Sequence, residues 1–140
     1  MARVKVTLPE SFGFAVQLPV RITDLNYGAH LGNDALLSLL HEARVQFLAS
    51  LGQAEFDAAT QLGFIMVDVA IEYKGEAFHG DVLTIKVAAT DPSRHGFDVV
   101  YSVTNQHNKP IARAKTGLLA FDYTTRKLRP LAPALATYFS

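Results

Sequence analysis

Cysteine is absent from this 140-residue chain, and neither a long hydrophobic run nor an excess of charge of one sign is present. Without cysteine there is no disulfide, no thiolate nucleophile and no cysteine-ligated zinc. Thirteen basic residues balance thirteen acidic ones, which argues against a nucleic-acid-binding protein, since such proteins normally carry a basic excess. No stretch approaches the roughly 18 apolar residues of a membrane span, and Met1–Pro9 lacks the apolar core of a signal peptide. We therefore expect a cytoplasmic protein without a membrane or nucleic-acid partner.

Signatures of metal and cofactor binding are also missing. The five histidines are dispersed, and no two of them have the spacing of a shared metal site on one helix. There is no glycine-rich phosphate loop and no dinucleotide fingerprint. We expect no metal and no resident cofactor.

The residues that are present favour a single globular domain spanning residues 1–140. The hydrophobic fraction is 49% and the charged fraction 19%, as in an average soluble domain. A chain of this length buries about two-thirds of the surface that it exposes when unfolded, which is enough for a core of its own.

Alternation of apolar and polar residues is the dominant pattern. Every second residue from Phe14 to Ile22 is apolar, which predicts a half-buried strand, and Pro19 suggests an edge position or a bulge there. The same pattern predicts a short strand over Val4–Leu8 and four later strands, over residues 65–74, 83–89, 97–103 and 111–121. The short, turn-rich connections between these later strands predict antiparallel hairpins.

Between the first strand and the others, the period changes. Apolar residues spaced by three and four predict a helix over Asp34–Leu51, about 27 Å long at 1.5 Å per residue. Most of its circumference is apolar, so other structure must surround it. A short helical turn is expected over Gln53–Leu62, and another in the tail after Pro130. The predicted class is α+β, with one sheet curled around one helix.

The segment Thr23–Asp34, just before the helix, concentrates the polar groups. Its twelve residues contain two carboxylates, two amides, one histidine and two glycines. The first turn of a helix has free N–H groups and a partial positive charge, so it can hold an anion or the oxyanion formed at an attacked acyl carbonyl. Gly28 and Gly32 would let a ligand approach the backbone closely. Capping by Asn33 or Asp34 and simple turn formation are the structural alternatives for this segment.

The stretch Arg21–Leu48, RITDLNYGAHLGNDALLSLLHEARVQFL, resembles the N-terminal signature of the hotdog-fold thioesterases of the 4-hydroxybenzoyl-CoA thioesterase-like superfamily. In that family a strand leads into a D-x-D or D-x-N loop, a glycine and histidine, and a long helix with an E-A-R turn. The Gly80-Asp81-Val82-Leu83 segment is similar to the family's entry into a later strand. The resemblance implies a hotdog fold, with a curved antiparallel sheet of about five to six strands around one long central helix.

The resemblance also implies a function and an assembly. Proteins of this family hydrolyse acyl-CoA or acyl carrier protein thioesters and assemble as homodimers, often tetramers, with the substrate at the subunit interface. The acyl carbonyl would lie at the start of the helix, where the N–H groups of Leu31, Gly32 and Asn33 would form the oxyanion site. Coenzyme A would enter as part of the substrate.

One position departs from the family pattern. Asn26 stands where the second acid of D-x-D acts on the thioester, and an amide can orient a water molecule but cannot be a general base. His30 matches the histidine of the plant-type acyl carrier protein thioesterases. The expected mechanism is a water held by Asn26 and activated by His30 or Asp24, with an unperturbed histidine suited to moving a proton near neutral pH. Further candidates at the site are Asn33, Asp34 and Glu42.

The phosphates of coenzyme A require cations. The candidates on predicted strands and hairpins are Lys74, Arg94, Arg113, Lys115 and Arg126. Arg113 and Lys115 are two residues apart and so share one sheet face, although a charged row on one face is also the ordinary solvent side of a sheet.

Two other functions remain open. The missing acid at Asn26 favours a protein that binds acyl-CoA without hydrolysing it. An enoyl-thioester hydratase is less favoured, because those enzymes resemble a D-x-N-P-x-H pattern, whereas Asp24 and His30 are six residues apart with no intervening proline.

Overall fold

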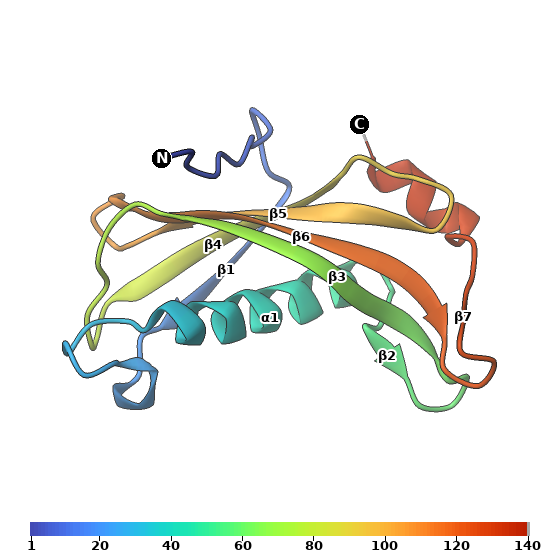
Figure 1. Cartoon of the computed structure of the whole chain (residues 1–140), viewed down its shortest axis with the longest axis horizontal. Coiled ribbons are helices and arrows are strands. Elements are labelled where there is room, and N and C mark those ends of the chain that lie inside the picture. The colour runs from blue at the N-terminus through green and yellow to red at the C-terminus, as the bar shows by residue number, and fades with distance from the viewer. Residues whose placement is uncertain (140) are drawn as a thin grey trace.

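The computed structural model of the chain describes residues 1–139. In chain order the elements are β1 (Phe14–Pro19), the 3-10 turn η1 (Ile22–Asp24), α1 (Asn33–Ser50), β2 (Phe56–Asp57), β3 (Leu62–Tyr73), β4 (Val82–Thr90), β5 (Gly96–Thr104), β6 (Pro110–Asp122), β7 (Lys127–Leu128) and η2 (Pro133–Tyr138). The strands form one curved sheet, and α1 lies in its concave side (Figure 1).

The sheet has the strand order β1-β4-β5-β6-β3-β2, with β7 paired to β6, and every pairing is antiparallel. This arrangement confirms the predicted α+β hotdog architecture. The sheet has seven strands rather than five or six. The two additional strands, β2 and β7, have two residues each, which is too short for alternation to reveal them.

Two local predictions are wrong. Residues 53–62 do not form a helical turn, because Phe56–Asp57 pairs with Leu62–Gly63 in a hairpin and Glu55 O accepts the N–H of Phe64. Val4–Leu8 forms no strand, since the Val6 N–H donates to the Glu72 carboxylate rather than to a neighbouring strand.

The ends of the first two elements also differ from the prediction. The first strand ends at Pro19 rather than Ile22, because the 3-10 turn η1 takes up residues 22–24. The helix runs one residue earlier than predicted at each end.

The core lies between α1 and the concave face of the sheet. Leu36, Leu40, Ala43 and Leu48 are at most 1% exposed and share one buried cluster with sheet residues such as Ile85. The opposite side of α1 remains open, with Val45 41% exposed. The sheet of this chain therefore covers only one side of α1, although the apolar sequence of the helix predicts that most of its sides are buried.

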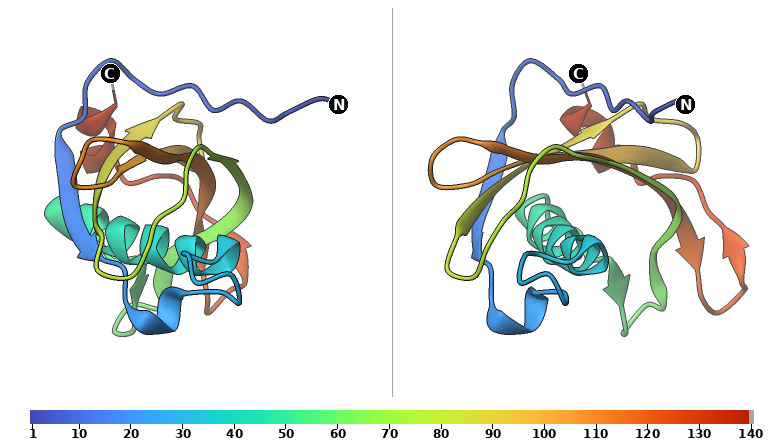
Figure 2. Two further views of the ribbon diagram at one scale, coloured as in Figure 1. Left: turned by 90° about the vertical axis from the view of Figure 1, so that its left-hand side faces the viewer. Right: turned by 60° about the vertical axis from the view of Figure 1, so that its left-hand side comes forward.

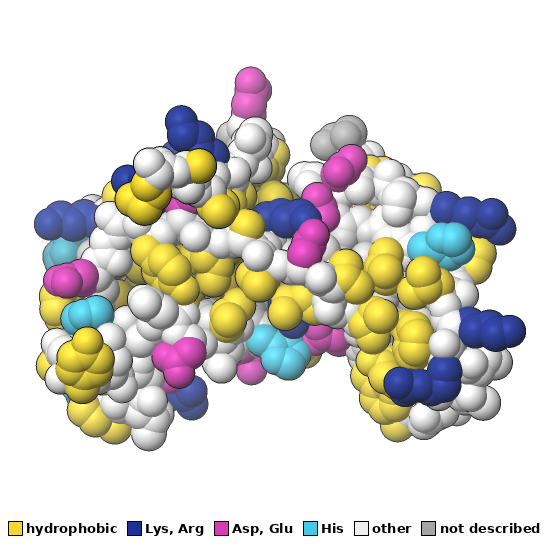
Figure 3. Space-filling model, viewed as in Figure 1, with side chains coloured by type: hydrophobic (Ala, Val, Ile, Leu, Met, Phe, Trp, Pro, Cys, Tyr) yellow, Lys and Arg dark blue, Asp and Glu magenta, His cyan; other side chains and the backbone are white. Residues whose placement is uncertain are grey.

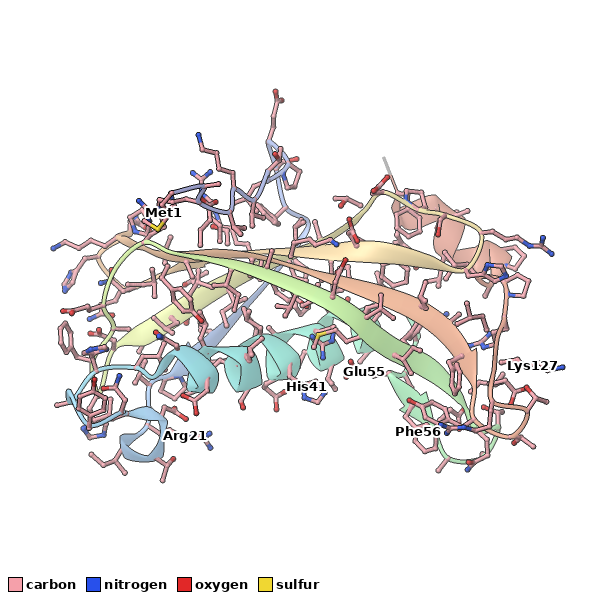
Figure 4. All side chains as sticks on the ribbon, in the orientation of Figure 1. Met1, Arg21, His41, Glu55, Phe56 and Lys127 are labelled. Carbon is pink, nitrogen blue, oxygen red and sulfur yellow. The ribbon has the colours of Figure 1, made fainter. Side chains whose placement is uncertain are left out.

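A buried polar chain fixes the helix to the sheet. The Arg44 guanidinium, 6% exposed, donates from Nε to Glu55 at 2.7 Å and from NH1 to the Tyr101 hydroxyl at 3.2 Å. Tyr101 lies 2.7 Å from the Thr116 hydroxyl, and burial raises the pKa of Tyr101, so it remains protonated at neutral pH. The other Glu55 oxygen is 2.7 Å from His41 Nε2 on the open side of the helix (Figure 4). The E-A-R turn is therefore an anchor, because its buried arginine is committed to Glu55 and to the buried Tyr101.

Candidate active site

The loop before α1 is a compact hairpin. The Asn26 N–H donates to His30 O at 2.9 Å, the Ala29 N–H donates to Asn26 O at 3.0 Å, and Leu25 pairs with Leu31 in an isolated bridge. Asn26 Oδ1 accepts the Gly28 N–H at 2.8 Å, which is the side-chain turn that asparagine favours. The oxygen of the Asn26 amide thus shapes the loop, while the other end of that amide remains a donor.

Asp24 has a structural environment. Its side chain is 7% exposed, and its carboxylate accepts the Arg21 N–H at 2.8 Å and the Arg21 guanidinium at 3.3 and 3.4 Å. Of the two candidate bases, Asp24 is the one already occupied by other donors.

The start of α1 offers free donors. The N–H of Leu31 donates to Ala77 O at 2.8 Å, and that of Gly32 donates to Asp24 O at 3.0 Å. Gly32 is the N-cap residue and no side chain caps the helix. Two members of the predicted oxyanion trio already have acceptors, and Asn33 is the one at the open first turn, where N–H groups lack intrahelical partners.

His30 lines a cavity of about 290 Å3 at this end of the helix. Its Nδ1 lies 3.2 Å from Leu31 O. Because a carbonyl oxygen only accepts, this contact assigns the proton of the neutral ring to Nδ1. Nε2 then carries the lone pair, as a general base requires.

Tyr73 is a site residue that the sequence reasoning missed. It ends β3, and its hydroxyl donates to Asn33 O at 3.0 Å across the cavity that His30 also lines. Burial, and after it the Asp34 carboxylate, raise the pKa of Tyr73, so its hydroxyl is a donor at neutral pH. In the sequence, Tyr73 is only the last apolar residue of an alternating strand, and nothing there distinguishes it as a site residue.

The remaining predicted residues lie in several places. Glu42 is exposed on α1, accepts from Gln46 at 2.8 Å, and lies about 12 Å along the helix from Asp34. Lys74 lines the His30 cavity, and together with Arg113 it also lines a second cavity. The other three predicted cations lie elsewhere. Lys115 is paired with Asp68 and Asp98, and Arg94 is in the β4–β5 loop at the opposite end of the sheet. Arg126 is in the β6–β7 turn, with its guanidinium 5.3 Å from the centre of the Phe121 ring.

Within residues 1–139, no three histidine or acidic side chains cluster closely enough to hold a metal ion. In the same part of the chain, no helix combines the length and hydropathy needed to cross a bilayer.

Comparison with known proteins places this geometry in a family. A sequence model of the thioesterase-like superfamily matches residues 20–139. The chain is 30% identical over 125 residues to a 1,4-dihydroxy-2-naphthoyl-CoA hydrolase of Synechococcus elongatus, with 87% of this chain and 91% of that protein aligned.

Solved structures share the fold. A 1,4-dihydroxy-2-naphthoyl-CoA thioesterase from Synechocystis has a TM-score of 0.81 at 23% identity, covering 89% of this chain and 93% of its own. A gentisyl-coenzyme A thioesterase has a TM-score of 0.81 at 16% identity, covering 91% and 100%. The structural likeness confirms the hotdog fold, and the match over residues 20–139 shows that the chain belongs to the thioesterase-like superfamily.

Proposed function

We propose that the protein hydrolyses an acyl-CoA thioester at the open first turn of α1. The observation that carries this proposal is the juxtaposition of three features at one cavity: the acceptor Nε2 of His30, the free N–H of Asn33 and the hydroxyl of Tyr73. The names of the relatives, which are acyl-CoA hydrolases, support the same reaction.

The proposed step begins with a water beside His30. Nε2 takes a proton as the water oxygen bonds to the thioester carbon, and the carbonyl oxygen becomes an anion. That anion lies at the positive end of α1, where helix N–H groups stabilise it. When the tetrahedral intermediate collapses, the C–S bond breaks and His30 returns the proton to the leaving sulfur. The products are a carboxylic acid and free coenzyme A.

We also propose that the acyl group is compact and aromatic. The cavity of about 290 Å3 is lined on its apolar side by Leu36, Ala77 and Ile111, with Tyr73 at its wall. A small pocket of this kind fits a substituted ring better than a long alkyl chain, and the three relatives described above are named for aromatic acyl groups.

A homodimer is part of the proposal. Beyond Gly63, the outer edge of β3 has no strand neighbour among the described residues, and Met66, Val67 and Val69 are 42–53% exposed. Figure 3 shows hydrophobic side chains running across this side of the molecule. An open, apolar edge strand is a template for pairing with a second copy.

Two experiments test these proposals. In the first, the protein is incubated with a panel of aromatic, short-chain and long-chain acyl-CoAs and the release of free thiol is measured. The rate should be highest for an aromatic thioester. Binding of acyl-CoA with no thiol release from any member would instead favour the non-hydrolytic alternative. Two residues motivate that alternative: the Asp24 carboxylate is bound to Arg21, and Asn26 is neutral. Light scattering should give a dimer for the wild type and a smaller species for Val69→Lys; a monomeric wild type would contradict the assembly.

A further inference from the structure

The N-terminal arm, residues 1–12, lies outside the segment that matches the family and forms no regular element. It runs over the convex face of the sheet, on the side away from α1 (Figure 2). Val6 holds it there: the side chain is buried, with the residue 7% exposed, and its N–H donates to Glu72 Oε2 at 2.9 Å. The arm is therefore docked on the sheet at the end of β3.

A cavity of about 650 Å3 lies between this arm and the sheet. Its charged lining consists of the cations Lys5, Lys74 and Arg113 and the single carboxylate of Glu72. That carboxylate is already engaged, with one oxygen on the Val6 N–H and the other 3.5 Å from Lys74 Nζ. These contacts, above all the one with Val6, lower the pKa of Glu72 and keep it ionised. Three cations against one carboxylate leave an excess of positive charge, which favours an anionic ligand.

Lys74 is common to this cavity and the candidate active site. It follows Tyr73 at the end of β3 and lines both the cavity of Lys5 and Arg113 and the cavity of His30. The two cavities therefore share a lining residue at the end of β3, as a ligand that reached from one to the other would require.

We infer that Lys5, Lys74 and Arg113 bind the phosphate groups of the coenzyme A moiety, with the N-terminal arm forming the outer wall of the phosphate site. This inference rests on the proposed function, because it concerns the nucleotide end of the same substrate. Guanidinium groups bind phosphate oxygens in pairs, and ammonium groups act as point charges. Lys115 has no such role, since its ammonium is held by Asp68 and Asp98 at 2.7 and 3.2 Å.

The test compares two substrates of the same acyl group, one on coenzyme A and one on pantetheine, which lacks the nucleotide and its phosphates. Lys5→Ala and Arg113→Ala, both at exposed positions, should each raise KM for the acyl-CoA about tenfold, the effect of losing one charged contact, with kcat within about twofold. Neither should change KM for the acyl-pantetheine. Lys86→Ala, an exposed cation on β4, is the matched control and should behave as the wild type. An unchanged KM for acyl-CoA, or an equal rise for both substrates, would overturn the inference.

Direct binding separates this inference from the hydrolysis itself. By calorimetry, the wild type should bind coenzyme A at least tenfold more tightly than pantetheine, and the variant carrying Lys5→Ala with Arg113→Ala should lose that advantage. This result would stand even if no thioester were hydrolysed. Equal affinities of the wild type for coenzyme A and pantetheine would refute the phosphate site even if hydrolysis were observed.

Discussion

The two ends of α1 carry cavities of different size and character. The cavity at the C-terminal end is the larger, about 420 Å3, and Phe14, Phe47, Leu51 and Val87 contribute its apolar walls. Its polar lining includes hydroxyl groups but no histidine, carboxylate or ammonium. The N-terminal cavity, about 290 Å3, contains His30, Lys74 and Glu76. The candidate catalytic groups therefore lie at the smaller of these two cavities.

The backbone of the helix explains the contrast. At the C-terminal end, Leu48 O accepts from Leu51 and Gln53, Ala49 O accepts from Gly52, and Gly52 has the positive φ of 73° that glycine tolerates. At the N-terminal end, no side chain caps the first turn. The chain itself supplies donors to the carbonyl groups at the C-terminal end of α1, while N–H groups at the N-terminal end remain free for a ligand.

The strongest test of the contrast is His30→Ala. Loss of the base should lower kcat for the best acyl-CoA by about 100- to 10,000-fold, the usual contribution of general base catalysis, with unchanged circular dichroism. His41→Ala, which alters an exposed histidine on α1, is the control and should retain most of the activity. Full activity of His30→Ala would remove the base from the proposed mechanism.

Phe47→Ala tests the other end. The Phe47 ring packs edge-on against Phe14 at 5.6 Å and is 6% exposed, so its removal should lower the free energy of unfolding by about 3 kcal/mol, as measured in urea. The kcat/KM should remain within about twofold at temperatures where the variant is folded. Gln46→Ala, on the exposed side of α1, should cost about 0.5 kcal/mol or less. A large fall in kcat/KM of folded Phe47→Ala would mean that the C-terminal cavity also takes substrate.

Tyr73→Phe sharpens the description of the N-terminal end. It removes only the hydrogen bond to Asn33 O, which positions the first turn of the helix. We expect kcat to fall about three- to tenfold, corresponding to about 1 kcal/mol, with KM less affected. An unchanged kcat would show that the helix start is held without this hydroxyl.

The smallest expected effect is a pH dependence in how firmly the N-terminal arm is held to the sheet. The Val6 amide and then Lys74 lower the pKa of Glu72 in the folded protein. A depressed folded-state pKa contributes stability above the unfolded-state pKa, about 4.3 for glutamate, and this contribution is lost as pH falls through the folded-state value. Hydrogen exchange at the Val6 amide, corrected for intrinsic rate, should show less protection at pH 3 than at pH 6. Glu72→Gln should weaken that dependence; equal loss in this variant would assign it to another group.

Alternation along β3 to β6 and the three- and four-residue spacing of α1 sufficed to predict the architecture, because such periodic patterns mark buried faces. They failed for β2, whose two residues are held by pairing with Leu62–Gly63, and for Val6, whose N–H finds a side chain 66 positions away.

The sequence predicted where in the chain the candidate site lies, but only part of its residue composition. The loop residues Asn26, His30 and Asn33 indicated the helix start from the sequence. The sequence could not show that Arg21 engages Asp24 or that Glu42 lies away from the cavity. Nor could it show that Tyr73 crosses to Asn33, a contact between residues 40 positions apart.

The sequence by itself therefore determined the long strands, the helix, the family and the loop of candidate catalytic groups, because local periodicity and short motifs encode these directly. The tertiary structure alone decided which donors and acceptors are already used and which remain free. It also brought Lys5, Lys74 and Arg113 around one cavity. Those outcomes depend on contacts between distant segments, which pack only once the sheet has curved around the helix.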